Sequence, residues 1–307
     1  MKRIDFTNCP IVPGRAYNGA NGKKISIEYE GKEYMLKFPS SSEKIKNELS
    51  YSNGTVSEHI GSSIYNMLGV EAQRTLLGTY MLKGKEKIVC ACEDFTADGS
   101  VMADFCSIKN SVIDSETQGT GTELSEILES IENQSFVNPQ DLLERFWDMF
   151  VIDTLLGNFD RHNGNWGILI NRNTGESRIA PVFDCGSCVL PQADETIIKS
   201  ILTNEKELNA RVYTFPRSAI KYNGEKISYY DFLTETDNEE CLNAIKRIVP
   251  RIDIEEIGTF IDDMLYISDL QKEFYKTYLN ARYEKILIPV YDQVMEEDED
   301  QSFGMTL

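Results

Sequence analysis

Residues 155–189 read LLGNFDRHNGNWGILINRNTGESRIAPVFDCGSCV, and this stretch decides how the rest of the chain is interpreted. Asp160 is followed five residues later by Asn165, and Asp184 comes after a predicted β-hairpin over residues 166–180. In phosphoryl transfer, one aspartate orients and deprotonates the attacking hydroxyl, while an asparagine and a second aspartate hold Mg²⁺ against the phosphates of ATP. An ordinary Asp/Asn-rich hairpin is the alternative. The combination with the downstream Phe-Asp-x-Gly favours a kinase over that alternative.

The composition is typical of a globular protein without a membrane segment. The chain has 307 residues, enough for one large domain or two lobes, and 41% of them are hydrophobic. No apolar run is as long as a membrane span and no signal peptide is evident, so we expect a cytoplasmic protein with no membrane partner. The net charge of −19 argues against direct nucleic-acid binding, which needs a basic surface.

The seven cysteines are expected to be reduced thiols in that compartment. Cys185 and Cys188 form a Cys-x-x-Cys pair that could be redox-active or half of a metal site. The chain has no second such pair and only two histidines, so the sequence does not favour a zinc site.

A glycine-rich loop precedes a second predicted hairpin over residues 25–38. Glycines allow backbone N–H groups to approach phosphate oxygens closely, and a lysine on the second strand can reach the same phosphates. Lys37 has this position, shortly before Pro39, which would end the strand. Each feature alone has an ordinary alternative, a plain turn for the loop and a solvent-facing side chain for Lys37. The loop residues are Gly19, Ala20, Asn21, Gly22 and Lys23.

Segments with helical periodicity follow the predicted hairpin nearer the N-terminus and precede the other one. Residues 43–68 predict a helix in two parts, the second capped by Thr55. Glu58 lies off its apolar stripe, where it could either pair with Lys37 or be solvated. A strong helix is predicted from Asn138, with Pro139 at its first position and a buried aromatic stripe.

Polarity and periodicity predict the structure of the remaining segments. Residues 107–122 are rich in Ser, Thr and Gly and predict a flexible loop, and the acidic run 296–300 predicts disorder. Helices are predicted near residues 123–131, 194–209, 227–233, 238–249, 253–266 and 268–296.

On these motifs, the chain resembles the HipA-like kinases, bacterial serine/threonine kinases found in toxin–antitoxin modules and as stand-alone kinases or effectors. Ala16 stands where the toxins have the serine that they autophosphorylate, which puts that form of self-inactivation in doubt. The family's phosphate loop is similar to residues 16–23, and its strand lysine before proline is similar to Lys37. Its Glu-x-Phe hinge is similar to Glu93–Phe95. Its Asp-x-His-x-x-Asn loop is similar to residues 160–165, and its metal-binding aspartate after an aromatic residue is similar to Asp184.

The resemblance implies a two-lobed, protein kinase-like α+β fold with the ATP site between the lobes. A β-rich N-lobe would span residues 1–95, a mostly helical C-lobe residues 96–295, and an acidic tail residues 296–307. Asp160 would be the catalytic base, and Asn165 and Asp184 would bind Mg²⁺. The nucleotide would be held by the glycine-rich loop, Lys37, Glu93, Phe95 and His162.

The activity so implied is transfer of the γ-phosphate of Mg·ATP to a Ser/Thr hydroxyl of a protein substrate. A small antitoxin protein is an implied partner, and a role as a toxin or as a secreted effector stays open. A phosphoinositide-type lipid kinase is the alternative enzyme, because Asp-Arg-His-Asn-x-Asn followed by Asp-x-Gly also resembles those enzymes. No basic membrane-facing patch is evident for it. A third interpretation is a catalytically silent ATP-binding scaffold, against which the intact Asp160, Asn165 and Asp184 weigh.

Overall fold

The structure is a computed structural model that describes residues 3–13, 24–39, 53–113 and 117–304, the last six of these by their backbone alone. Residues 19–23, predicted to cover phosphates, lie outside the described residues, as does Ala16. The elements in chain order are β1 (Lys24–Tyr29), β2 (Lys32–Lys37), α1 (Gly54–Met67), β3 (Thr75–Leu82), β4 (Lys85–Glu93), β5 (Ser100–Asp104), α2 (Phe105–Val112), α3 (Leu124–Asn133), α4 (Pro139–Leu156), β6 (Gly167–Asn171), β7 (Ser177–Ile179), α5 (Glu195–Thr203), α6 (Glu205–Tyr213), β8 (Lys221–Tyr222), β9 (Glu225–Lys226), α7 (Tyr229–Glu235), α8 (Glu239–Ile248), α9 (Ile254–Asp262), α10 (Asp269–Arg282) and α11 (Ile288–Gly304).

The N-terminal part of the chain is a four-stranded antiparallel sheet with the strand order β1-β2-β4-β3. Residues 4–11 run along this sheet and form isolated bridges to β3 and β1. Together they enclose a small apolar core that includes Phe6, Ile27 and Leu36, each fully buried. The predicted hairpin that ends at Lys37 is confirmed, and its register places Lys24 directly opposite Lys37.

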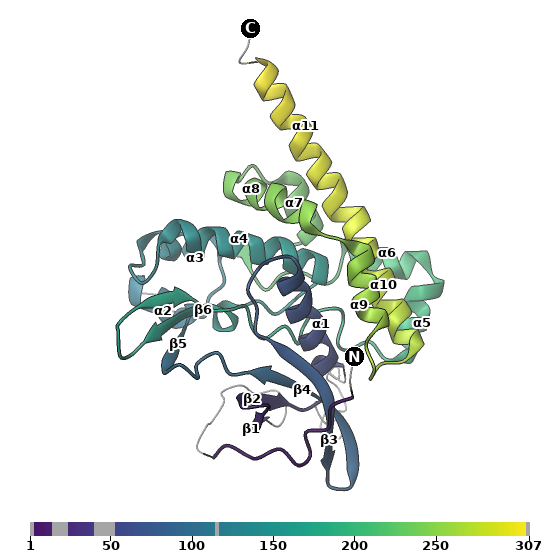
Figure 1. The fold of residues 1–307 in the computed structure, drawn as a ribbon. Coiled ribbons are helices and arrows are strands. Elements are labelled where there is room, and N and C mark those ends of the chain that lie inside the picture. The colour runs from purple at the N-terminus through teal and green to yellow at the C-terminus, as the bar shows by residue number, and fades with distance from the viewer. Residues whose placement is uncertain (1–2, 14–23, 40–52, 114–116, 305–307) are drawn as a thin grey trace.

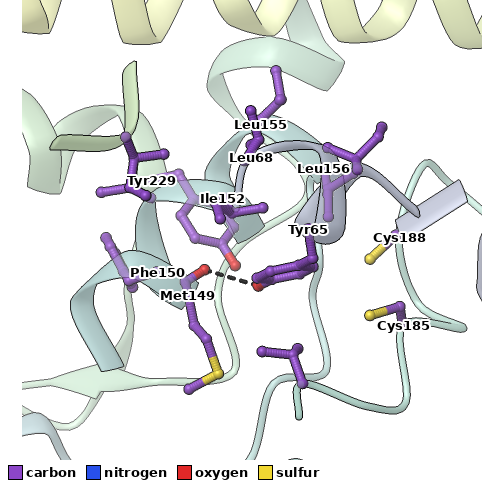
Figure 2. Close-up of a cluster of buried hydrophobic side chains, with 14 of the residues drawn as sticks. Tyr65, Leu68, Met149, Phe150, Ile152, Leu155, Leu156, Cys185, Cys188 and Tyr229 are labelled. Atoms are coloured by element: carbon purple, nitrogen blue, oxygen red, sulfur yellow. Dashed lines mark hydrogen bonds between the residues drawn. The ribbon is translucent and has the colours of Figure 1, made fainter. Parts of the chain in front are cut away.

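Helix α1 lies between this sheet and the helical part of the chain (Figure 1). Its apolar residues Ile60, Ile64 and Leu68 belong to the large core that extends through α4 and the C-terminal helices. Tyr65 is fully buried there, and its hydroxyl donates to the Met149 carbonyl of α4 at 3.1 Å (Figure 2). Helix α1 therefore shares a core with the helical part of the chain.

Helix α4 has the predicted ends and the predicted buried face. The Asn138 side chain accepts a hydrogen bond from Gln140 N–H at 2.9 Å, Pro139 takes the first position, and Gly157 ends the helix with φ +60°. Its aromatic residues pack in the core, with Trp147 fully buried. The helix therefore provides a rigid base for the loop that begins at Gly157.

The predicted hairpin after this loop is confirmed as β6 and β7, and β5 adds a third strand that the sequence did not indicate. The expectation of a flexible loop over residues 107–122 is wrong for residues 107–112, whereas residues 117–122 lie outside the helices and strands. Residues 105–112 form α2, which is capped by Asp104 accepting from Ser107 N–H at 2.8 Å. Lys109 of α2 is fully buried and donates to the Gly121 carbonyl at 2.6 Å, which anchors the following segment.

Three further helix boundaries differ from the prediction. Asn53, one residue before the first helical residue, takes the cap position of α1 in place of Thr55. The single helix predicted over 194–209 is two helices, because Asn204 ends α5 and caps α6 through Lys206 N–H at 3.0 Å. The long helix predicted from Ser268 contains a π-helical turn at 283–287, just before Pro289, which cannot donate a helical hydrogen bond.

The acidic run 296–300 is helical rather than disordered, since α11 continues through it to Gly304. Part of its charge is balanced by Lys246, whose Nζ lies 2.5 Å from Asp298 Oδ2. The end of α11 projects beyond the other helices (Figure 1). Within the described ranges, every helix is too short or too polar to cross a bilayer.

His59 of α1 gives the fold a specific acid sensitivity. The residue is 7% exposed, its Nδ1 lies 2.9 Å from Thr75 Oγ1, and burial lowers the pKa of the imidazole to about 4 from an ordinary 6.5. The unfolded chain therefore binds a proton at higher pH than the folded chain. We expect the unfolding free energy to fall by roughly 2–3 kcal/mol on this account between about pH 7 and about pH 4.5.

Urea unfolding of the wild type and of His59→Gln across this pH range measures that contribution. The variant keeps a polar partner for Thr75 but cannot titrate, so its stability should fall less steeply with acid. Parallel curves for the two proteins would show that His59 is not held neutral.

Candidate active site

Lys37, at the end of β2, lies between two carboxylates. Its Nζ is 2.7 Å from Glu58 Oε2 and 2.9 Å from Asp184 Oδ1. Glu58 is fully buried on α1, and its Oε1 accepts a hydrogen bond from Cys185 N–H at 3.2 Å. Burial opposes a charge on Lys37, but the Asp184 and Glu58 carboxylates raise its pKa well above the ordinary value. Of the two alternatives that the sequence left open for Glu58, the structure shows the pairing with Lys37, and the pair places a positive charge beside Asp184.

Asp184 begins the loop after the β6–β7 hairpin with φ +56°, a left-handed conformation that Asp and Asn adopt more readily than most residues. The Lys37 ammonium lowers the pKa of its carboxyl to about 2, against the effect of burial. The carboxylate is therefore ionised at neutral pH. Its side chain is 46% exposed, so it remains accessible to a ligand.

Asp160 and Asn165 lie on one tight loop after α4. Asn165 Nδ2 donates to the Asp160 carbonyl at 2.8 Å, and Asn158 Oδ1 accepts from Asp160 N–H at 3.1 Å. Burial raises the pKa of the Asp160 carboxyl; the nearby Asp184 carboxylate raises it further, while His162 lowers it. A raised pKa makes Asp160 a better proton acceptor. The loop and the hairpin thus bring both predicted aspartates within electrostatic range of each other.

Arg161 joins the elements that carry these residues. Its Nε donates to Asp153 Oδ2 at 3.0 Å, and its Nη1 donates to the carbonyls of Asn165 at 3.0 Å and Phe183 at 2.5 Å. Asp153 Oδ1 also accepts from the Tyr65 hydroxyl of α1 at 2.8 Å. One buried ion pair therefore links the Asp160 loop, the Asp184 loop and the helix that carries Glu58. Sequence reasoning missed Asp153, although an acidic residue among the core positions of α4 was a usable signal.

We expect Asp153→Asn to lower the unfolding free energy by roughly 3–5 kcal/mol, because it leaves the Arg161 charge buried without its partner. Turnover should fall with it, since Arg161 holds both the Asp160 loop and the Asp184 loop. Tyr65→Phe removes the hydroxyl that bonds to the Met149 carbonyl and to Asp153 but leaves the Asp153–Arg161 ion pair intact, so it should lower the unfolding free energy by only about 1–2 kcal/mol. Urea unfolding and turnover of the two variants test this; wild-type values for Asp153→Asn would contradict the linking role.

Asn165 and Asp184 are the residues suited to a divalent cation. The Asn165 Nδ2 is engaged by the Asp160 carbonyl, which leaves Oδ1 for a cation, and Asp184 provides an ionised carboxylate. Across the described part of the chain, His, Cys, Asp and Glu side chains nowhere gather in groups of three or more that could hold a metal ion. This donor set fits Mg²⁺, which usually takes one or two protein oxygens and completes its shell with phosphate oxygens and water.

Cys185 and Cys188 are both free thiols and both fully buried. Their sulfurs lie beside the Tyr65 and Leu156 side chains of the core (Figure 2). Gly61 of α1 packs directly on them, because a Cβ at that position would lie 2.7 Å from Cys185 Cβ. The pair therefore seats α1 against the loop that follows Asp184.

Lys24 is a second cation at the site that sequence reasoning missed. It is opposite Lys37 in the β1–β2 register, and directly paired residues project to the same face of a sheet. Burial lowers its pKa and the Lys37 charge lowers it further, while Asp184 and Glu58 oppose this shift. Two lysines therefore lie on the sheet face above Asp184. The signal in the sequence was the hairpin register, which depends on the turn at Glu30–Gly31.

The predicted hinge residues have different environments. Glu93 uses its N–H for the Arg74 carbonyl at 2.8 Å and its carbonyl for Gln73 Nε2 at 2.9 Å. Its backbone is thus engaged within the chain, and we expect a nucleotide base to meet the hinge at Phe95 instead. The Phe95 ring lies 5.8 Å from that of Phe183, beside Asp184. His162 is exposed and accepts from Gly164 N–H at 3.0 Å, which shapes the Asp160 loop.

Comparison with known proteins agrees with this geometry. The family model of the HipA-like C-terminal domain matches residues 17–255. The serine/threonine-protein kinase CtkA of Helicobacter pylori strain J99 is 50% identical over 297 residues, which are 96% of this chain and 90% of that protein.

Solved structures give the same result. The crystal structure of the proinflammatory kinase CtkA of Helicobacter pylori matches with a TM-score of 0.90 at 49% identity, over 96% of this chain and 98% of that one. HipA of Shewanella oneidensis MR-1, solved in a complex with HipB and operator DNA, matches with a TM-score of 0.54 at 16% identity over 92% of this chain and 70% of that one, a likeness of fold alone. The predicted two-lobed, protein kinase-like α+β fold is thereby confirmed. The chain belongs to the HipA-like family of serine/threonine protein kinases.

Proposed function

We propose that this chain binds Mg·ATP between its sheet and its helical part and transfers the γ-phosphate to a serine or threonine hydroxyl of a protein. The observation that carries the proposal is the convergence of Lys37, Glu58 and Asp184 from three separate elements, next to Asp160. Such a lysine–glutamate pair beside a metal-binding aspartate is the arrangement required for catalysis in protein kinases.

In this proposal each residue has one task. Lys37, with Lys24 beside it, binds the nucleotide phosphates, and Glu58 fixes the position of Lys37. Asn165 and Asp184 hold Mg²⁺, which when bound neutralises negative charge on the phosphates. Asp160 orients the acceptor hydroxyl and accepts its proton, helped by a raised pKa.

Neither alternative has comparable support. A silent scaffold would not need the buried ion pair that positions the Asp160 loop, and the described residues retain all of Lys37, Asp160, Asn165 and Asp184. A lipid kinase would not share 50% identity with a serine/threonine-protein kinase over 96% of the chain. The expected antitoxin partner and cytoplasmic location stay predictions, since the likeness to HipA is one of fold alone.

Phosphoamino-acid identification tests the proposal. The chain is incubated with Mg·ATP and a protein acceptor that offers serine, threonine and tyrosine, and the modified residues are identified by mass spectrometry. We expect phosphoserine or phosphothreonine with the wild type and neither with Asp160→Asn. Phosphotyrosine alone, or no phosphoamino acid, would contradict the proposal.

A further inference from the structure

The β8–β9 hairpin is fastened to the Asp160 loop through the segment 117–123. Asn163 of the loop is buried, and its Nδ2 donates to the Gly119 and Gly121 carbonyls, at 2.8 Å each. At the next residue, the Thr122 carbonyl accepts from Lys221 N–H at 2.8 Å. The hairpin therefore takes its position from the same residues that fix the loop of the catalytic base.

Glu123 also binds this hairpin through its side chain. It occupies the N-cap position of α3, yet its side chain makes no capping bond there. Its carboxylate instead accepts from Asn223 N–H at 2.7 Å and Gly224 N–H at 3.0 Å, the two residues of the hairpin turn. A side chain that could have stabilised its own helix thus holds the hairpin tip rigid.

The other end of the hairpin also reaches the Asp160 loop. Ile227 N–H donates to the Ile220 carbonyl at 3.0 Å, which closes the base of the hairpin. Tyr229 follows, and its hydroxyl donates to the Asn158 carbonyl at 2.5 Å. The hairpin is consequently held on both sides of Asp160, and all six of its residues are exposed.

Its exposed face carries two lysines that have no ion-pair partner among the described residues. Lys221 and Lys226 are directly opposite each other in the β8–β9 register, so their side chains project from the same face. Like charges at directly opposite positions destabilise a strand pair. Neither ammonium group forms an ion pair within residues 117–304 or any other described range. An anionic ligand would remove this repulsion.

We propose that the β8–β9 hairpin is the docking surface for the protein acceptor and that it selects segments with acidic residues next to the serine or threonine. This inference rests on the proposed function and names its substrate class. Two observations support it: the hairpin lies beside Asp160, and its two lysines have no ion-pair partner among the described residues. Consistent with that place, the Lys226 charge acts on Asp160, where it opposes the burial that raises the pKa of that carboxyl.

The net charge of the chain allows an effect of the hairpin to be told apart from a general electrostatic attraction. The chain has a net charge of −19, so a general electrostatic attraction would favour basic polypeptides. A preference for acidic acceptors would therefore come from the hairpin and not from the field of the whole protein.

The test is fluorescence anisotropy with three labelled serine peptides, whose flanking residues are acidic, neutral or basic. Binding is measured with a non-hydrolysable Mg·ATP analogue present, in the wild type and in Asp160→Asn. The acidic peptide should bind most tightly to both proteins. Lys221→Glu/Lys226→Glu should weaken its binding by roughly tenfold or more and favour the basic peptide, and Lys221→Gln/Lys226→Gln should abolish the preference without reversing it.

The matched control is Lys83→Glu/Lys85→Glu, which changes the net charge equally at two exposed positions, in the turn after β3 and at the start of β4. It should keep the preference for the acidic peptide. An equal loss in the control and in the hairpin variant, or equal binding of acidic and neutral peptides by the wild type, would overturn the proposal. Because binding needs no turnover, acidic preference without phosphorylation would refute the proposed function while the docking surface stood.

Discussion

Replacement of Asp160 by asparagine is expected to lower kcat by about 10²–10⁴-fold with little change in the affinity for Mg·ATP. The substitution keeps the size of the side chain but removes the proton acceptor. The bonds that shape the loop involve the Asp160 backbone, which donates to Asn158 Oδ1 and accepts from Asn165 Nδ2, so they survive. The loss should therefore lie in the chemical step.

Calorimetric titration with a non-hydrolysable ATP analogue, alongside turnover measurements, checks this result. Asp141→Asn, at the exposed start of α4, is the matched control and should change neither quantity. A large loss of nucleotide affinity in Asp160→Asn would show that Asp160 holds the nucleotide and is not the base.

Replacement of Asp184 should remove the contribution of Mg²⁺ to nucleotide binding and reduce turnover by at least about 10³-fold, since in the proposed function Asp184 holds the Mg²⁺ that contacts the phosphates. Asp184→Asn is the informative variant, because asparagine adopts the φ of +56° more readily than alanine does. It also removes one of the two carboxylates that contact Lys37, so that Lys37 would pair with Glu58 alone.

Nucleotide titrations with Mg²⁺ and with a chelator separate the two roles. The wild type should bind the analogue more tightly with Mg²⁺, and Asp184→Asn should bind it equally in both conditions. If the variant retained the full Mg²⁺ effect, the metal assignment would be wrong. Thermal unfolding of both proteins provides the control for folding.

The candidate site was visible in the sequence wherever a local pattern set the geometry. The spacing of Asp160, Asn165 and Asp184 around a hairpin was enough to predict their convergence, because a tight loop and a two-stranded turn leave few alternatives. Lys37 was placed by its strand, and α4 by its caps at Asn138 and Gly157. These are short-range features that a single sequence contains.

Long-range contacts were not visible. Asp153 and Arg161 form a buried pair whose bonds reach α1 and the Asp184 loop, and such bonds depend on packing between elements that are distant in sequence. Residues 107–122 appeared flexible because they are polar. Buried Lys109, with bonds to Gly121 and Glu126, instead connects α2 to the chain from Gly121 onward. Polarity indicates a loop only when the polar groups have no internal partners.

The most direct test of the central claim is the fate of the γ-phosphate in a single reaction. The chain is incubated with Mg²⁺ and γ-labelled ATP, together with a protein acceptor and vesicles that contain phosphoinositide, and label is measured in protein, lipid and free phosphate. We predict label on serine or threonine of protein, lost in Asp160→Asn. Label in lipid, or none beyond free phosphate, would contradict the account.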